Sequence, residues 1–152
     1  MKEILTVFAV LGLDLGTKVW AGRTLPLHQK KEIVKNHLYL WHIKNNGMAY
    51  NRFAGKRKGI LLSTGLLLAF YAGLFLRILL GYGEKFMALP LAVITGGGFG
   101  NFLERLQKGR VTDFIYIPFR KRNAPIFNFA DVCIVGGGIW LVMKVIWKSV
   151  ES

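Results

Sequence analysis

The amino-acid sequence predicts an all-α membrane protein with four transmembrane helices and a small β-sheet at the membrane surface. Three observations support this fold class. Four stretches are apolar and long enough to cross a bilayer, which takes roughly 17–25 helical residues. The chain of 152 residues is 53% hydrophobic and only 19% charged, whereas about a quarter of a typical soluble domain is charged. A segment of the first long connection alternates as a short strand does.

The four predicted spans cover about residues 4–21, 60–80, 87–103 and 129–147. The second is the most uniformly apolar, and its single charge, Arg77, lies near its end, where a long side chain can reach the interface. The first follows Lys2 as the core of a cleavable signal peptide would. Asp14 and Lys18 interrupt that core, however, and three more spans follow. We therefore expect a retained span and one integral membrane domain over residues 1–152.

The connection between the first two predicted spans contains a strand signal. Tyr39 and Trp41 alternate with other side chains at period two. An Asn-Asn-Gly turn signal follows at residues 45–47, and residues 48–53 are predicted to return as a second strand. The surface sheet is thus predicted within about residues 33–56, with its aromatic side chains at the level of the lipid headgroups.

Span parity predicts that the first and third connections lie on one side of the membrane, opposite both termini and the short second connection. The polar residues in or near the spans gather at the ends that meet these two connections. They are Asp14, Lys18, Asn101, Glu104, Arg105, Asp113, Asn128 and Asp131. Ionisable groups at membrane depth are costly and often functional, so a polar pocket between helices is predicted at this face. Asp14 and Lys18, four residues apart, fit a structural ion pair equally well.

Paired carboxylates offer the best-supported chemistry. Two carboxylates in a partly dry site do not both ionise readily, so one pKa rises and the pair shares a proton. Such a pair activates water against a peptide carbonyl without a metal or a covalent intermediate. Asp113 and Asp131 are the natural partners, because one lies in the third connection and the other just beyond its end. On charge alone, Asp14 and Glu104 remain rivals.

Other chemistries find little support. His28, His37 and His42 lack a ligand-like spacing, which favours surface histidines over a metal site. The glycines of residues 96–100 lie inside a span, which favours close helix packing over a dinucleotide-binding loop. The net charge of +13 is compatible with nucleic acid. Because Lys and Arg lie mostly between long apolar runs, we expect lipid headgroups instead, and neither a cofactor nor nucleic acid.

Five short motifs stand in order along nearly the whole chain. They are Asp14-Leu-Gly-Thr-Lys18, Asn45-Asn-Gly47-Met-Ala-Tyr, Gly100-Asn101-Phe-Leu-Glu-Arg105, Gly109-Arg-Val-Thr-Asp113-Phe and Phe127-Asn128-Phe-Ala-Asp131. Together they resemble the bacterial lipoprotein signal peptidase (signal peptidase II) family, and the run of the last three is highly specific. Glu104 stands where this motif usually has Asp, and Met48 and Tyr50 also depart from common choices. These departures leave open a divergent paralogue with a narrower substrate set.

The resemblance implies a membrane aspartyl endopeptidase that removes signal peptides from prolipoproteins just before the diacylglyceryl-modified cysteine. Asp113 and Asp131 match the catalytic aspartates, and Asn128 would orient Asp131. The other matched residues would line the pocket, belong to an extracytoplasmic sheet that cradles the substrate, or support the site from within the spans. These are Asn101 and Arg105, then Asn45 and Gly47, and then Asp14, Lys18 and Glu104.

The resemblance also implies a place: the bacterial cytoplasmic (inner) membrane, with the active site at the outer leaflet face. Both long connections are rich in Lys and Arg, and the positive-inside rule would put them in the cytoplasm. We favour the family topology, because a lipid-modified cysteine is processed at the outer leaflet. The expected partners are prolipoprotein substrates and membrane lipids, and the oligomeric state is not predicted.

Two alternatives of other classes stay open at this point. One is a non-catalytic relative that binds lipidated peptides. The other is a small proton-coupled transporter subunit, since Asp and Lys inside spans also mark proton paths. Charges at both membrane faces would favour the transporter, but the polar candidates gather at one face.

Overall fold

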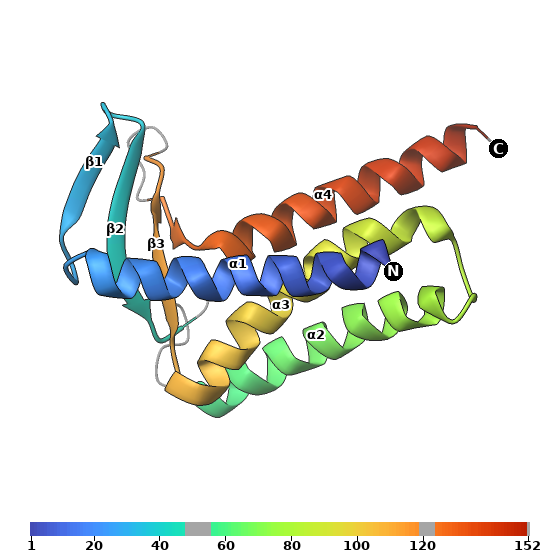
Figure 1. Cartoon of the computed structure of the whole chain (residues 1–152), viewed down its shortest axis with the longest axis horizontal. Helices are drawn as coiled ribbons and strands as arrows, with labels where there is room; N and C mark the ends of the chain where they lie inside the picture. Colours follow the sequence, from blue (N-terminus) through green and yellow to red (C-terminus); the bar gives the residue numbers. More distant parts are fainter. Residues whose placement is uncertain (48–55, 119–123, 152) are drawn as a thin grey trace.

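The computed structural model describes residues 1–47, 56–118 and 124–151. Each predicted span falls on a long helix that is apolar enough to cross a membrane. These helices are α1 (Lys2–Thr24), α2 (Arg57–Leu79), α3 (Ala88–Lys108) and α4 (Phe129–Val150), with the short 3-10 helix η2 (Lys85–Met87) before α3 (Figure 1). The fold class is confirmed. The helices continue past most predicted ends, as α3 does through its polar last turn to Lys108 before Gly109 ends it at a φ of 70°.

The surface sheet is wider than the predicted range 33–56. Its strand order is β1-β2-β3-β4, and all three pairings are antiparallel. The strands are β1 (Lys30–Val34), β2 (Leu38–Asn45), β3 (Val111–Tyr116) and β4 (Ile126–Phe127). The strand signal at Tyr39 and Trp41 is confirmed as β2, whereas the predicted return strand at residues 48–53 lies outside the described residues. The sheet therefore draws two strands from each long connection.

Helix α3 lies at the centre of the bundle and packs against the other three helices. Of its apolar span 56% is buried, against 17–22% for the others, so α1, α2 and α4 present most of their surfaces outward. Small residues allow this packing: a Cβ on Gly96 would lie 2.8 Å from the Cβ of Val10, and one on Gly97 would lie 2.8 Å from the carbonyl oxygen of Ala130. The prediction that these glycines serve close helix packing is confirmed.

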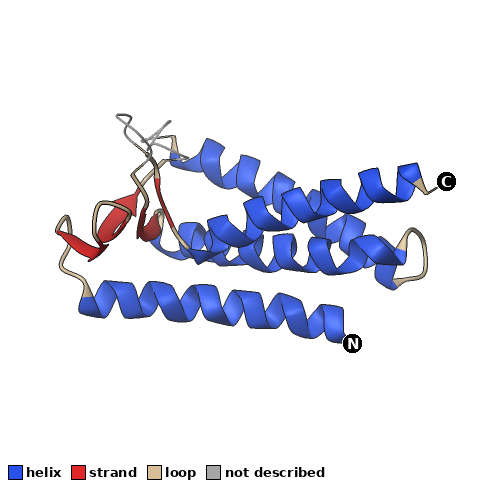
Figure 2. Ribbon diagram, turned by 90° about the horizontal axis from the view of Figure 1, so that it is seen from above, coloured by secondary structure: helices blue, strands red, loops and turns tan. Residues whose placement is uncertain are grey.

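The two ends of the bundle differ in character. The sheet lies at one end, and both termini lie toward the other, together with the turn between α2 and α3 (Figures 1 and 2). Span parity therefore predicted the arrangement of the connections correctly. Strand β3 leaves α3 and pairs with β2 at the sheet end, where Ile43 stands opposite Asp113. This pairing brings residues of the first and third connections together beside the start of α4.

Candidate active site

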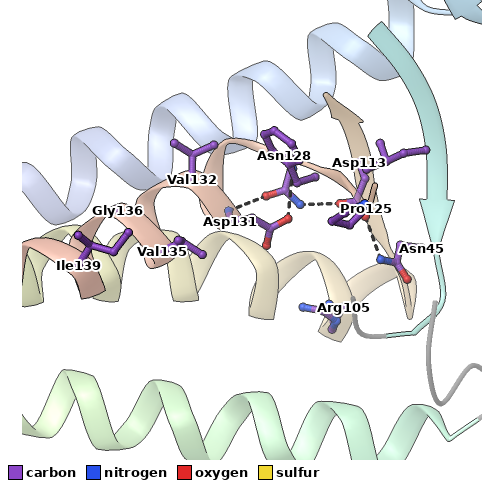
Figure 3. Close-up of a pocket in the computed structure, with 12 residues that line it drawn as sticks. Asn45, Arg105, Asp113, Pro125, Asn128, Asp131, Val132, Val135, Gly136 and Ile139 are labelled. Carbon is purple, nitrogen blue, oxygen red and sulfur yellow. Dashed lines mark hydrogen bonds between the residues drawn. The ribbon is translucent and has the colours of Figure 1, made fainter. Parts of the chain in front are cut away.

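The predicted carboxylate pair meets at one cavity. Asp113 lies in β3 and Asp131 in the first turn of α4, and both side chains line a cavity of about 580 Å³ (Figure 3). The described lining residues come from β2, α3, β3, α4 and the segment before α4. They are Asn45, Arg105, Asp113, Pro125, Ile126, Phe127, Asn128, Asp131, Val132, Val135, Gly136 and Ile139. Of the carboxylates in the described chain, Asp113 and Asp131 alone line this cavity.

Asp113 is held by two side-chain amides. The Nδ2 of Asn45 donates to its Oδ2 at 2.9 Å, and the Nδ2 of Asn128 donates to its Oδ1 at 2.7 Å. The residue is only 1% exposed, because the first four residues of β3 are all buried. This burial, and after it the negative charge of Asp131, raises the pKa of Asp113 to about 7, against the lowering effect of the two amides.

Asn128 connects the two aspartates. It is the N-cap of α4: its side chain accepts the N–H of Asp131 at 3.0 Å, and the Oδ2 of Asp131 accepts the N–H of Asn128 at 3.1 Å. Its amino group donates to Asp113 on the other side (Figure 3). The expectation that Asn128 orients Asp131 agrees with this geometry, but its contact with Asp113 was not predicted.

Asn101 and Lys18 form a second layer behind the pair. The Nζ of Lys18 donates to the Oδ2 of Asp14 at 2.7 Å and to the Oδ1 of Asn101 at 2.8 Å. Asn128 also donates to that Oδ1, at 3.1 Å. The amino group of Asn101 is thereby turned toward Asp131, whose Oδ1 accepts it at 2.8 Å. Lys18 thus fixes the amide orientation that Asp131 requires.

The rivals Asp14 and Glu104 are absent from the described lining of the cavity. The Oδ1 of Asp14 accepts the N–H of Ala130 at 2.9 Å, tying α1 to the start of α4. Glu104 accepts the N–H of Thr112 at 3.0 Å and its hydroxyl at 2.8 Å, and Lys108 at 3.1 Å. Glu104 therefore secures β3 next to Asp113. Thr112, which the sequence did not single out, donates to both carboxylate oxygens of Glu104 and so accommodates a side chain longer than that of Asp.

Arg105 lines the cavity and also binds the backbone of the first connection at Gly47. Its Nη2 donates to the carbonyl oxygen of Gly47 at 3.3 Å. The N–H of Gly47 in turn bonds the Oδ1 of Asn45 at 2.9 Å. Asn45 and Gly47 therefore act together, because the bond to Gly47 leaves the amino group of Asn45 directed at Asp113.

Two further findings go beyond the sequence prediction. An apolar stripe follows Asp131 along α4, and it consists of Val132, Val135, Gly136 and Ile139. The helical spacing of these residues from Asp131 could have revealed the stripe in the sequence. The prediction of surface histidines is wrong for His42. That residue is buried, because β2 turns its ring inward, and its Nδ1 lies 3.0 Å from the carbonyl oxygen of Leu25.

Lys18 offers a test of the second layer. Substituting Lys18→Met leaves the buried carboxylates of Asp14, at 2.7 Å, and Glu104, at 3.6 Å, without its charge. We expect a loss of about 3–5 kcal/mol in the free energy of unfolding, as for other broken buried pairs, measured by denaturation in detergent. The double variant Asp14→Asn/Lys18→Met should be more stable than Lys18→Met. A double variant that loses the sum of both single effects would contradict this reading.

The chain has relatives of known family over nearly its whole length. The family model for signal peptidase (SPase) II matches residues 6–147. A lipoprotein signal peptidase of Syntrophus aciditrophicus (strain SB) is 30% identical, over 98% of this chain and 94% of the relative. One of Clostridium novyi (strain NT) is 31% identical, over 94% of this chain and 95% of the relative.

Solved structures agree with these relatives. A bacterial membrane enzyme solved at 2.3 Å superposes with a TM-score of 0.86 and 25% identity, over 99% of this chain and 91% of that chain. A second, solved at 1.9 Å, gives a TM-score of 0.81 and 26% identity, over 95% and 92%. The chain therefore belongs to the signal peptidase II family, the aspartic membrane peptidases that remove signal peptides from lipoprotein precursors.

Proposed function

We propose that this chain cuts prolipoproteins just before a diacylglyceryl-modified cysteine, with Asp113 and Asp131 as the dyad that activates water. The observation that carries the proposal is the pairing itself. Two carboxylates from different elements line one cavity and are bridged by a single residue, Asn128, whose side-chain amino group donates to Asp113 and whose backbone N–H donates to Asp131. Gathering like charges in a buried site costs stability, and a protein that only bound lipidated peptides would gain nothing from it.

The two aspartates take different roles in this proposal. Asp113, with a pKa of about 7, carries the shared proton near neutral pH, so it serves as the general acid. Asp131 is then the general base. Each carboxylate accepts two N–H donors: Asp113 from Asn45 and Asn128, and Asp131 from Asn101 and Asn128. The remaining lone pairs are left for substrate and water. Arg105, in the same cavity, is placed to bind a backbone carbonyl of the substrate.

The proposed reaction balances without a further reactant. Asp131 takes a proton from water as the oxygen attacks the scissile carbonyl carbon, and Asp113 gives its proton to the carbonyl oxygen. In the resulting diol the carbon–nitrogen bond breaks. The leaving nitrogen takes the proton held by Asp131, and one diol hydroxyl returns a proton to Asp113. The products are the carboxyl end of the signal peptide and the free amine of the lipidated cysteine.

The test is a cleavage assay with purified protein in detergent and a diacylglyceryl-modified prolipoprotein. Mass spectrometry should find one new amino terminus, at the lipidated cysteine. The same precursor without its diacylglyceryl group is the matched control and should be cut far more slowly. Binding of the lipidated precursor without any cleavage would instead support the non-catalytic alternative.

The pH dependence of cleavage follows from the raised pKa of Asp113. Because the acid must be protonated, kcat/KM should fall about tenfold for each pH unit above about 7, measured from pH 5 to 9. The Asn45 hydrogen bond lowers this pKa, so in Asn45→Ala the falling limb should move to higher pH. A profile that stays flat to pH 9 would exclude Asp113 as the acid.

We also propose that the sheet end of the molecule faces outward, at the outer leaflet. The supporting consideration is chemical: the lipidated cysteine is anchored in that leaflet. Lys35, on the sheet end, and Lys85, at the opposite end, are both exposed. In a Cys133→Ala background, a membrane-impermeant thiol reagent applied to intact cells should label Lys35→Cys and spare Lys85→Cys. The reverse pattern would place the site in the cytoplasm, as the positive-inside rule suggests.

A further inference from the structure

A second apolar groove reaches Asp131 from a different side of α4. It has a volume of about 230 Å³ and lies between α2, α3 and α4. Its described lining is mostly aliphatic and aromatic, and consists of Thr64, Leu67, Leu68, Tyr71, Ile94, Gly98, Asn101, Phe102, Arg105, Asp131 and Ile134. Nothing in the reaction described so far makes use of this groove.

The two grooves meet at the reacting groups. Asp131 and Arg105 line both the larger cavity and this second groove. From that junction the larger groove follows α4 along Val132, Val135 and Ile139, while the smaller one runs between α2 and α3. A substrate whose scissile bond lies at Asp131 is therefore offered two separate apolar paths.

The proposed substrate branches at the same point. The apolar segment of the signal peptide ends at the scissile bond, and the acyl chains begin on the side chain of the next residue, the cysteine. Both branches are apolar and start within a few atoms of the scissile carbonyl. A site for this substrate needs two apolar grooves that diverge from its catalytic groups.

Size and shape assign one branch to each groove. The cavity along α4 has a volume of about 580 Å³, more than twice the volume of the groove between α2, α3 and α4, so the bulkier branch, the signal-peptide helix, is assigned to the larger cavity. Beside the larger groove, no atom of another element lies within 4 Å of where a Cβ on Gly136 would stand. A partner helix can approach closely at such a position.

From these observations we infer that the groove between α2, α3 and α4 binds the acyl chains of the substrate's diacylglyceryl group, while the stripe along α4 receives the signal-peptide helix. The inference rests on the proposed function. It commits to the substrate's own acyl chains as the occupant, because the groove opens onto Asp131 of the proposed dyad and onto Arg105 beside it. Chains of bulk phospholipid are the alternative that the experiment must distinguish.

The test compares three tryptophan variants on substrates that differ only in acyl-chain length. Leu67→Trp narrows the second groove, Val135→Trp narrows the first, and Leu66→Trp is the matched control outside both. The three side chains are similarly exposed, at 57%, 61% and 63%, and none has a hydrogen bond to the dyad. The measured quantity is the ratio of kcat/KM for a long-chain to a short-chain substrate, in detergent.

In Leu67→Trp this ratio should fall about tenfold, as expected when roughly two methylene groups lose their burial. Val135→Trp should lower both rates by one common factor and so keep the wild-type ratio. The control Leu66→Trp should also keep the wild-type ratio. An unchanged ratio in Leu67→Trp would overturn the inference and leave bulk lipid as the occupant. If wild-type protein cuts neither substrate, it is the proposed function that fails, so the two failures are distinguishable.

Discussion

Replacing either Asp113 or Asp131 by asparagine is expected to lower kcat for prolipoprotein cleavage by about 10²–10⁴-fold, the contribution typical of a general acid or base. Asparagine has nearly the same shape as aspartate but neither takes nor gives the required proton. Both side chains line the cavity. The fold should survive, because neither carboxylate belongs to the ion pairs of Lys18. Cleavage of the lipidated precursor and thermal stability in detergent are the two measurements.

The control for this prediction is Glu84→Gln, which changes an exposed carboxylate at the opposite end of the bundle and should leave cleavage at the wild-type rate. The double variant Asp113→Asn/Asp131→Asn should be scarcely slower than either single variant, since groups that act as a unit are not additive. A single variant with wild-type activity would remove that aspartate from the dyad.

Removing the side chain of Asn128 should have the second largest effect on activity. In Asn128→Ala the two bonds that reach the aspartates are lost, to Asp113 at 2.7 Å and to the N–H of Asp131 at 3.0 Å. We expect kcat to fall by about 10²-fold, because a small misplacement of catalytic groups has effects of that size. The helix also loses its N-cap, which should lower the free energy of unfolding by about 1 kcal/mol.

Asn128→Ser separates these two effects. A serine restores an N-cap for α4, but its side chain is too short to replace the amino group that donates to Asp113. The serine variant should therefore be about 1 kcal/mol more stable than the alanine variant and equally impaired in cleavage. Should serine restore activity together with stability, Asn128 would act only as a helix cap.

The spans were predictable because each helix satisfies its own backbone hydrogen bonds, so a run of apolar residues is sufficient to identify it. The sheet was predictable only in part, because the pairing that joins its two halves, β2 with β3, is distant in sequence. Strand β1 (Lys30–Val34) is fully exposed and largely charged, so it has no apolar face to detect. Strand β3 is buried at each of its first four residues, and these include the polar Thr112 and Asp113, so it shows neither an alternating pattern nor a continuous apolar run.

The site was predictable only in part for a related reason. Span parity placed all the acidic candidates at one face, but it did not choose among them. Asp14 and Glu104 are set apart by their partners, the N–H of Ala130 and the N–H of Thr112. Such partners come from other elements of the fold, so spacing along the chain does not reveal them, and the family resemblance was needed to select Asp113 and Asp131.

The hydrogen bonds of the site also determine when it exists during synthesis. Asn45 and Asp113 are 68 residues apart, Lys18 and Asn101 are 83 apart, and Asp14 and Ala130 are 116 apart. The last of these contacts, and Asp131 itself, arrive with the first turn of α4. A nascent chain with three spans already inserted therefore holds only Asp113 of the proposed dyad. If Asp113 and Asp131 are the dyad as proposed, the peptidase gains its activity only once the start of the fourth span has been made.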